Sequence, residues 1–108
     1  MDVTLPAFID VGALTDIPRL GARCVKTGTG DIAVFRTGDD RVFALRDECP
    51  HRHGPLSMGI VHGASVTCPL HAWVISLESG EAEGPDTGCT QRFAIKLEQG
   101  RVLLAVMP

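Results

Sequence analysis

The sequence ECPHRHGPLSMG, residues 48–59, places one cysteine and two histidines within five positions, followed directly by a Gly-Pro pair. Glycine and proline interrupt regular secondary structure, so this stretch is predicted to form a loop. Nineteen residues after Cys49 the chain reads CPLHAW, residues 68–73, with a second cysteine close to a histidine. Two loops rich in soft metal ligands indicate that a metal centre organises this part of the fold.

The candidate ligands are Cys49, His51, Cys68 and His71, so each loop offers one thiolate and one imidazole. Zinc accepts two cysteines and two histidines, but its usual spacing groups cysteine with cysteine and histidine with histidine. A mixed pair from each loop suits a two-iron cluster in which one iron takes both cysteines and the other takes both histidines. A [2Fe-2S] cluster is therefore favoured, and a structural zinc site is the alternative.

The pattern Cys-x-His, sixteen residues, Cys-x2-His resembles the signature of the Rieske iron–sulfur family. This resemblance implies an all-β fold: an antiparallel sandwich or meander base with an inserted cluster-binding subdomain. Residues 1–108 would form one Rieske-like domain, with the subdomain at about residues 47–91. The motif GPLS, residues 54–57, matches the family, which implies that Leu56 shields the cluster from solvent. Residues 83–86, EGPD, fall where the family carries a third covering loop.

Outside the ligand loops the sequence predicts β-structure and one helical turn at residues 10–17. Alternating apolar residues and Gly/Asp turns mark the expected strands: residues 3–9, 23–27, 32–36, 42–46, 92–97 and 101–106, and two short ones at 64–67 and 72–77. In the strand at 92–97, Phe93, Ile95 and Leu97 would share one face. Residues 47–91 are rich in Gly, Pro, His and Cys, and are expected to depend on the metal for their order.

Composition excludes several classes of function. The 108 residues are 44% hydrophobic and 21% charged, as in one ordinary globular domain. A net charge of −3 gives no reason to expect binding to nucleic acid or to an anionic membrane. The longest apolar runs are far shorter than the roughly 18 residues of a membrane-spanning helix. The first ten residues carry no visible export signal, so a cytoplasmic location is predicted.

The remaining cysteines and histidines are interpreted as structural or incidental. Cys24 is expected to be a half-buried strand residue, and Cys89 a loop residue. His53 and His62 fall outside the ligand pattern and are interpreted as exposed loop residues.

Departures from the family bear on the reduction potential. Respiratory Rieske proteins carry a disulfide between their cluster loops, whereas the matching positions here are Gly54 and Leu70. Those proteins also place serine and tyrosine hydroxyls near the cluster, where this chain has Trp73 and Ile75. Fewer hydrogen bonds to the sulfurs leave their negative charge less stabilised, so we expect a potential on the order of −150 mV.

Residues 54–90 resemble the small subunit of assimilatory NAD(P)H-dependent nitrite reductase, above all in Trp-Val-Ile at 73–75, SLESGEA at 76–82 and Gly-Cys-Thr at 88–90. The resemblance implies a large partner subunit with FAD, sirohaem and a [4Fe-4S] centre, which reduces nitrite to ammonium. No substrate site is then expected on this chain, which relays electrons or stabilises its partner. The alternatives are a soluble ferredoxin of an aromatic ring-hydroxylating dioxygenase and a zinc-stapled structural module.

Overall fold

The computed structural model describes residues 7–28, 30–50, 54–70, 72–84 and 87–106. Its elements are ten strands and two 3-10 turns: β1 (Ala7–Ala13), η1 (Leu14–Asp16), β2 (Gly21–Thr27), β3 (Gly30–Arg36), β4 (Val42–Arg46), η2 (Leu56–Met58), β5 (Ile60–His62), β6 (Ser65–Thr67), β7 (Val74–Ser76), β8 (Arg92–Phe93), β9 (Ile95–Glu98) and β10 (Arg101–Val106). The protein is all-β, as predicted.

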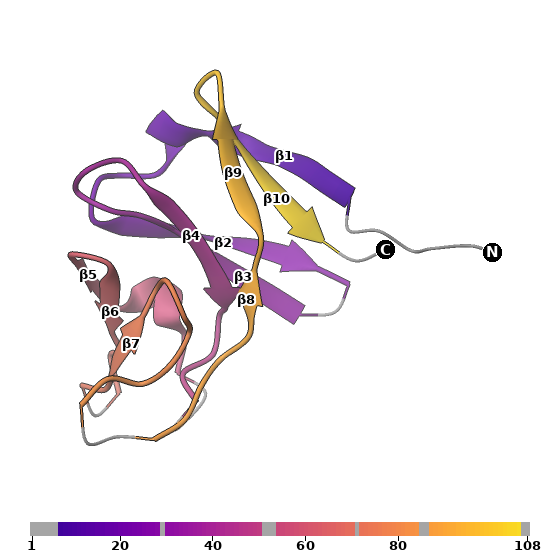
Figure 1. Cartoon of the computed structure of the whole chain (residues 1–108). Helices are drawn as coiled ribbons and strands as arrows, with labels where there is room; N and C mark the ends of the chain where they lie inside the picture. Colours follow the sequence, from indigo (N-terminus) through magenta and orange to yellow (C-terminus); the bar gives the residue numbers. More distant parts are fainter. Residues whose placement is uncertain (1–6, 29, 51–53, 71, 85–86, 107–108) are drawn as a thin grey trace.

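The strands form three antiparallel sheets (Figure 1). Sheet A has the order β1-β10-β9, sheet B the order β2-β3-β4-β8, and sheet C the order β5-β6-β7. Sheet C lies between β4 and β8 in the sequence, so it is an insertion into sheet B. The insertion expected from the sequence is thus visible in the topology, while its boundaries at about residues 47–91 stay a prediction.

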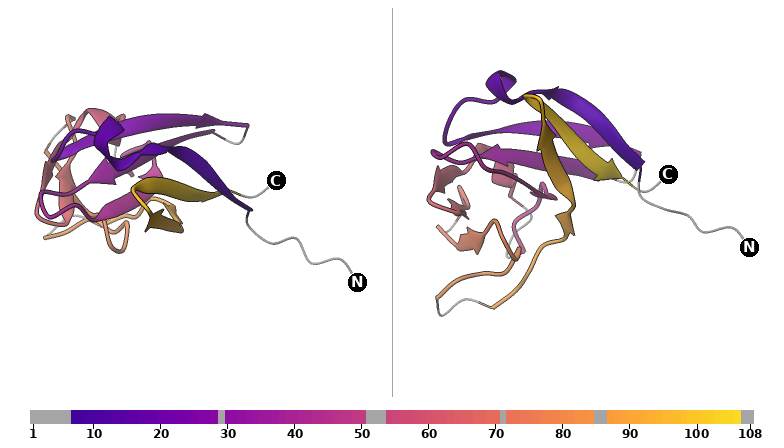
Figure 2. Two further views of the ribbon diagram at one scale, coloured as in Figure 1. Left: turned by 90° about the horizontal axis from the view of Figure 1, so that it is seen from above. Right: turned by 45° about the horizontal axis from the view of Figure 1, so that its top comes forward.

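Sheet B lies between sheet A and the inserted region (Figure 2). Buried apolar side chains pack on both of its faces. Successive residues of β3 point to opposite faces. Ile32 and Val34 pack with Val102 and Leu104 of sheet A, whereas Ala33 and Phe35 pack against the inserted region; all are buried. The continuous apolar run of β3 follows from this burial on both faces.

The inserted region buries more carbon than the sequence analysis expected, in an apolar core that it shares with sheet B. Its dependence on a metal for order stays a prediction. Its core side chains, each at most 3% exposed, pack with Phe35 and Leu45 of sheet B. They are Cys49, Leu56, Val61, Val66, Cys68, Ile75 and Leu77. Burial is greater than expected because a short segment can complete its core with the second face of an existing sheet.

Strand boundaries differ from the sequence prediction at both ends of the chain. The first strand continues to Ala13, and the helical turn is confined to Leu14–Asp16. Residues 92–97 form two strands rather than one, because the chain leaves sheet B after Phe93 and joins sheet A at Ile95. Phe93 and Ile95 pack in one core, but Leu97 is 39% exposed. Strand β5 was not predicted.

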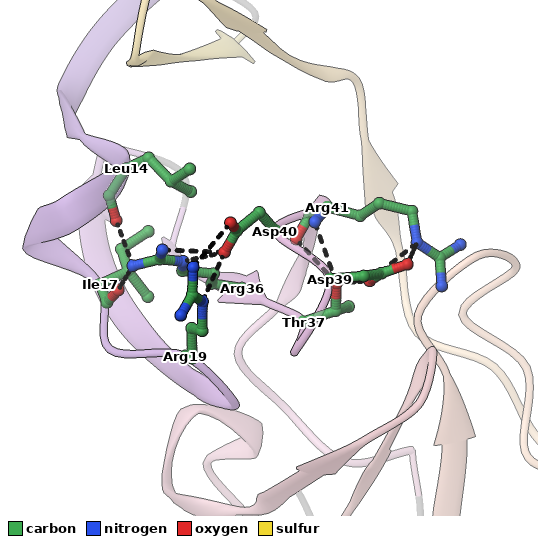
Figure 3. A network of polar contacts seen from close by, with 8 residues as sticks. All are labelled: Leu14, Ile17, Arg19, Arg36, Thr37, Asp39, Asp40 and Arg41. Carbon is green, nitrogen blue, oxygen red and sulfur yellow. Dashed lines mark hydrogen bonds and ion pairs between the residues drawn. The ribbon is translucent and has the colours of Figure 1, made fainter.

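A polar network fixes the turn between β3 and β4 to the segment after β1 (Figure 3). The buried guanidinium of Arg36 donates to the carbonyl oxygens of Leu14 and Ile17, at 3.3 and 2.8 Å. It also pairs with Asp40, at 2.8 Å, and Arg19 reaches the same carboxylate at 3.0 Å. The pKa of Asp40 is lowered to about 2, chiefly by the hydrogen bonds from Arg19 and Arg36.

Candidate metal centre

Two buried thiols, Cys49 and Cys68, lie together in the core of the inserted region. Their exposed fractions are 0% and 1%, and both belong to the apolar cluster that contains Leu56 and Ile75. Their side chains are hydrogen-bonded to each other, and neither forms a disulfide. The structure therefore unites the two cysteines that the sequence assigned to a metal site.

Each cysteine begins a short loop that a backbone hydrogen bond closes in the same way. The Cys49 N–H donates to the Gly54 carbonyl oxygen at 2.8 Å, and the Cys68 N–H donates to the Trp73 carbonyl oxygen at 2.7 Å. In both cases the acceptor is five residues after the donor. The cysteines thus occupy equivalent positions in two similarly closed loops, as expected for two halves of one binding site.

The electrostatics of the pair favour a positively charged ligand. The pKa of Cys68 is raised to about 11, first by burial and then by the hydrogen bond with Cys49. The Leu70 N–H, 3.4 Å from the Cys68 Sγ atom, acts in the opposite direction. Two adjacent buried thiolates are costly unless a cation neutralises them, and metal binding releases their protons. The donor chemistry therefore fits the cysteine side of an iron–sulfur cluster, a centre that accepts and donates single electrons when bound.

A glycine permits close contact between the two cysteine loops. A Cβ atom on Gly54 would lie 2.9 Å from Leu70 Cδ1 and 3.4 Å from Cys68 Sγ. The loop after β7 approaches the same region: a Cβ atom on Gly88 would lie 3.2 Å from Pro50 Cβ and 3.6 Å from Trp73 Cζ3. Gly88 supports the prediction of a third loop near the site, although Pro85 and Asp86 lie outside the described residues.

The two histidine ligands predicted from the sequence, His51 and His71, lie outside the described residues, as does His53. The full set of Cys49, His51, Cys68 and His71 therefore stays a prediction. Within the described ranges, no three His, Cys, Asp or Glu side chains meet in a way that could hold a metal ion. His62 is exposed on β5, a strand rather than a loop, with its Nε2 atom 2.7 Å from Thr67 Oγ1.

The other two cysteines are free thiols at the surface. Cys24 lies in β2 as predicted, but it is exposed rather than half-buried. Its pKa is raised by burial of the sulfur and by a hydrogen bond to Asp47. Cys89 lies outside the named strands and forms an isolated bridge with Glu81.

Asp47 is a buried residue that the sequence did not single out. It lies two positions before Cys49 and is 9% exposed. Its carboxylate accepts two hydrogen bonds from Ser57. In the sequence, only its position just before a ligand loop could have indicated a role at the site.

Two cavities are lined by residues that the structure describes. One, of about 300 Å³, is lined mainly by apolar side chains of β4, β8 and β9, with Leu77 and Arg92. The other, of about 340 Å³, is lined by Glu81, Ala82, Thr87, Gly88 and Cys89.

No helix in the described ranges is long and apolar enough to cross a membrane.

Comparison with known proteins identifies the fold and the centre. The family described as the Rieske [2Fe-2S] domain matches residues 7–94. The anthranilate 1,2-dioxygenase ferredoxin subunit of Burkholderia cepacia is 33% identical over 102 residues, which cover 94% of each chain.

Two solved structures superpose over almost the full chain. One is a chain from the complex of oxygenase and ferredoxin in carbazole 1,9a-dioxygenase, with a TM-score of 0.81, 29% identity, and coverage of 91% of this chain and 92% of that one. The other is a putative NADH-dependent nitrite reductase small subunit from Mycobacterium tuberculosis, with a TM-score of 0.84, 19% identity and 99% coverage of both chains. With its paired buried cysteines, this chain belongs to the Rieske [2Fe-2S] family, whose domain implies a Rieske-type [2Fe-2S] cluster.

Proposed function

We propose that this protein is the electron-transfer small subunit of an NAD(P)H-dependent nitrite reductase. The observation that carries an electron-transfer role is the buried pair of Cys49 and Cys68 in two matched loops. The choice of system rests on residues 54–90, whose sequence resembles that small subunit from the GPLS motif to Gly-Cys-Thr at 88–90. The proposed location is the cytoplasm, where NAD(P)H is available.

In this proposal, Cys49 and Cys68 bind one iron of the cluster, and His51 and His71 bind the other. Leu56, which is fully buried in the same apolar cluster as both cysteines, would shield the cysteine side. Electrons then leave through the imidazole side, because the sulfur side faces apolar core. Replacing His71 with alanine should abolish the cluster, whereas His53→Ala should leave it intact. The reverse result would contradict the ligand assignment.

The proposed partner is the large subunit with FAD, sirohaem and a [4Fe-4S] centre, which holds the nitrite site. In this proposal the chain carries electrons and has no substrate site of its own. Glu81 lines the cavity at Gly88 and would repel nitrite there.

A second candidate function is the ferredoxin of a ring-hydroxylating dioxygenase. The 33% identity to the anthranilate 1,2-dioxygenase ferredoxin subunit, over 94% of both chains, favours it. Both functions require the same fold and the same cluster, so the difference lies in the acceptor.

Stopped-flow oxidation of the reduced protein distinguishes the two acceptors. The reduced cluster is mixed with a sirohaem nitrite reductase large subunit and nitrite, or with a terminal dioxygenase and its aromatic substrate. Rapid, saturable oxidation by the first enzyme alone supports the proposal. Oxidation by the dioxygenase alone would replace it with the second candidate.

A cluster-free variant separates electron relay from stabilisation of the large subunit. Cys68→Ser removes a proposed iron ligand at almost constant side-chain size. If the cluster relays electrons, this variant should bind the large subunit without restoring NAD(P)H-dependent nitrite reduction. If it restores full activity, the role of the chain is structural.

A further inference from the structure

Asp47 occupies an unusual position for an ionisable side chain. It is 9% exposed, and it lies two residues before Cys49, where the first ligand loop begins. A buried carboxylate is costly unless hydrogen bonds replace its lost water. Both of its oxygens are used by one residue: Oδ1 accepts the Ser57 N–H and Oδ2 accepts the Ser57 hydroxyl, each at 2.7 Å.

The contact satisfies a donor at the start of η2. The first N–H groups of any helix lack partners within it and are usually capped by a preceding side chain. Here the residue before η2 is Pro55, which makes no side-chain cap. Asp47 supplies the acceptor from ten residues earlier in the chain.

The same contact encloses the first ligand loop. The hydrogen bond from Cys49 to Gly54 closes an inner ring, and the Asp47–Ser57 pair closes an outer ring around it. Leu56, next to Ser57, is fully buried in the cluster of side chains that contains both cysteines. Movement of Ser57 would therefore disturb the packing around Cys49.

Asp47 is itself fixed to sheet B. Its N–H donates to the Asp31 carbonyl oxygen in β3 at 3.0 Å. Asp47 thus connects the central sheet, through its main chain, to η2, through its carboxylate, across the base of the loop.

We propose that Asp47 is a positioning residue for the metal centre: through Ser57 it holds η2 and the first ligand loop in the geometry that retains the cluster. Outer partners that orient metal ligands typically change metal affinity by about 10- to 100-fold when they are removed. The inference rests on the cluster and on Cys49 as a ligand. It does not depend on which enzyme accepts the electrons.

The test is the rate of iron release from the purified holoprotein to a ferrous chelator, together with the visible circular dichroism of the cluster. Asp47→Ala should increase the rate by about 10- to 100-fold. Ser57→Ala, which keeps the backbone contact, should give a smaller increase. Asp47→Asn should restore most of the retention, because the amide can accept from the Ser57 N–H and donate to the hydroxyl.

Asp31→Asn is the matched control. The Asp31 side chain pairs with Lys26 at the surface. Asp47 contacts only the backbone carbonyl of Asp31, which the substitution keeps, so the rate of iron release should match that of the wild type. The proposal is overturned if Asp47→Ala and Ser57→Ala lower the thermal midpoint of unfolding without changing iron release or the spectrum. It is also overturned if Asp47→Asn loses iron as fast as Asp47→Ala. Should Asp47→Ala fail to fold, Ser57→Ala and Asp47→Asn decide the question.

Discussion

Gly54 and Cys68 lie on different loops, yet a Cβ atom placed on the glycine would be 3.4 Å from the Cys68 sulfur. The same Cβ would be 2.9 Å from Leu70 Cδ1, closer than real Cβ contacts allow. The absence of a side chain at Gly54 therefore allows the two cysteine loops to approach this closely.

Gly54→Ala should weaken cluster retention because Leu70 must move away from Cys68. The clash involves the end of a flexible side chain, so Gly54→Ala with Leu70→Ala should recover part of the loss. Iron content after gel filtration measures the effect. Gly28→Ala is a suitable control, since a Cβ there meets no atom within 4 Å. Equal iron loss in this control would contradict the role of Gly54.

The reduction potential should be low, on the order of −150 mV. The Leu70 N–H at 3.4 Å is a long donor to Cys68 Sγ, and Ile75, fully buried in the surrounding core, has no hydroxyl to donate. Few hydrogen bonds to the sulfurs make reduction harder. A redox titration followed by EPR checks this, and a strongly positive midpoint would refute it.

Two of the four cysteines should be required for the cluster, and the other two should be dispensable. Cys49→Ser and Cys68→Ser should each abolish the visible absorption of the cluster, since both thiols are buried at the site. Cys24→Ser and Cys89→Ser should retain full iron and sulfide content, since both residues are exposed. A colourless, zinc-loaded wild-type preparation would instead support the structural zinc alternative.

Acid stability should depend on Asp40, whose pKa is lowered from 3.8 to about 2 by Arg19 and Arg36. A carboxylate with a lowered folded-state pKa contributes stability above its unfolded pKa and loses it as the pH falls through the folded pKa. Asp40→Asn should therefore be less stable than the wild type above about pH 4, with the difference shrinking towards about pH 2.

Asparagine is the appropriate substitution because Asp40 has a φ of +65°, a conformation that asparagine tolerates. Urea unfolding across this pH range measures the difference. Glu98→Gln serves as the control, since Glu98 pairs with Lys96 at the surface. A stability difference that stays constant with pH would show that the Arg19 and Arg36 contacts do not act through charge.

The sequence predicted most strands because hairpin turns and alternating apolar residues are local signals. It failed where tertiary packing decides. Residues 92–97 read as one strand, but the break at Ala94 arises because the chain passes between two sheets. Burial of the inserted region was underestimated because part of its core, namely Ala33, Phe35 and Leu45, comes from sheet B.

For the site, the repeated cysteine–histidine spacing was sufficient to predict that Cys49 and Cys68 meet. Asp47 could not be recognised, because its partner Ser57 lies beyond the ligand loop and the contact exists only once that loop has closed. A carboxylate near a metal motif is usually a solvated surface group. Its burial, which is a tertiary property, is what distinguishes it.

The hydrogen bonds that close the two cysteine loops join main-chain atoms alone, from Cys49 to Gly54 and from Cys68 to Trp73. Because these hydrogen bonds involve no side chains, exposed loop residues such as Ala72 can differ without opening either loop. The surface that meets an electron acceptor can therefore change while the geometry that holds the two cysteines stays the same.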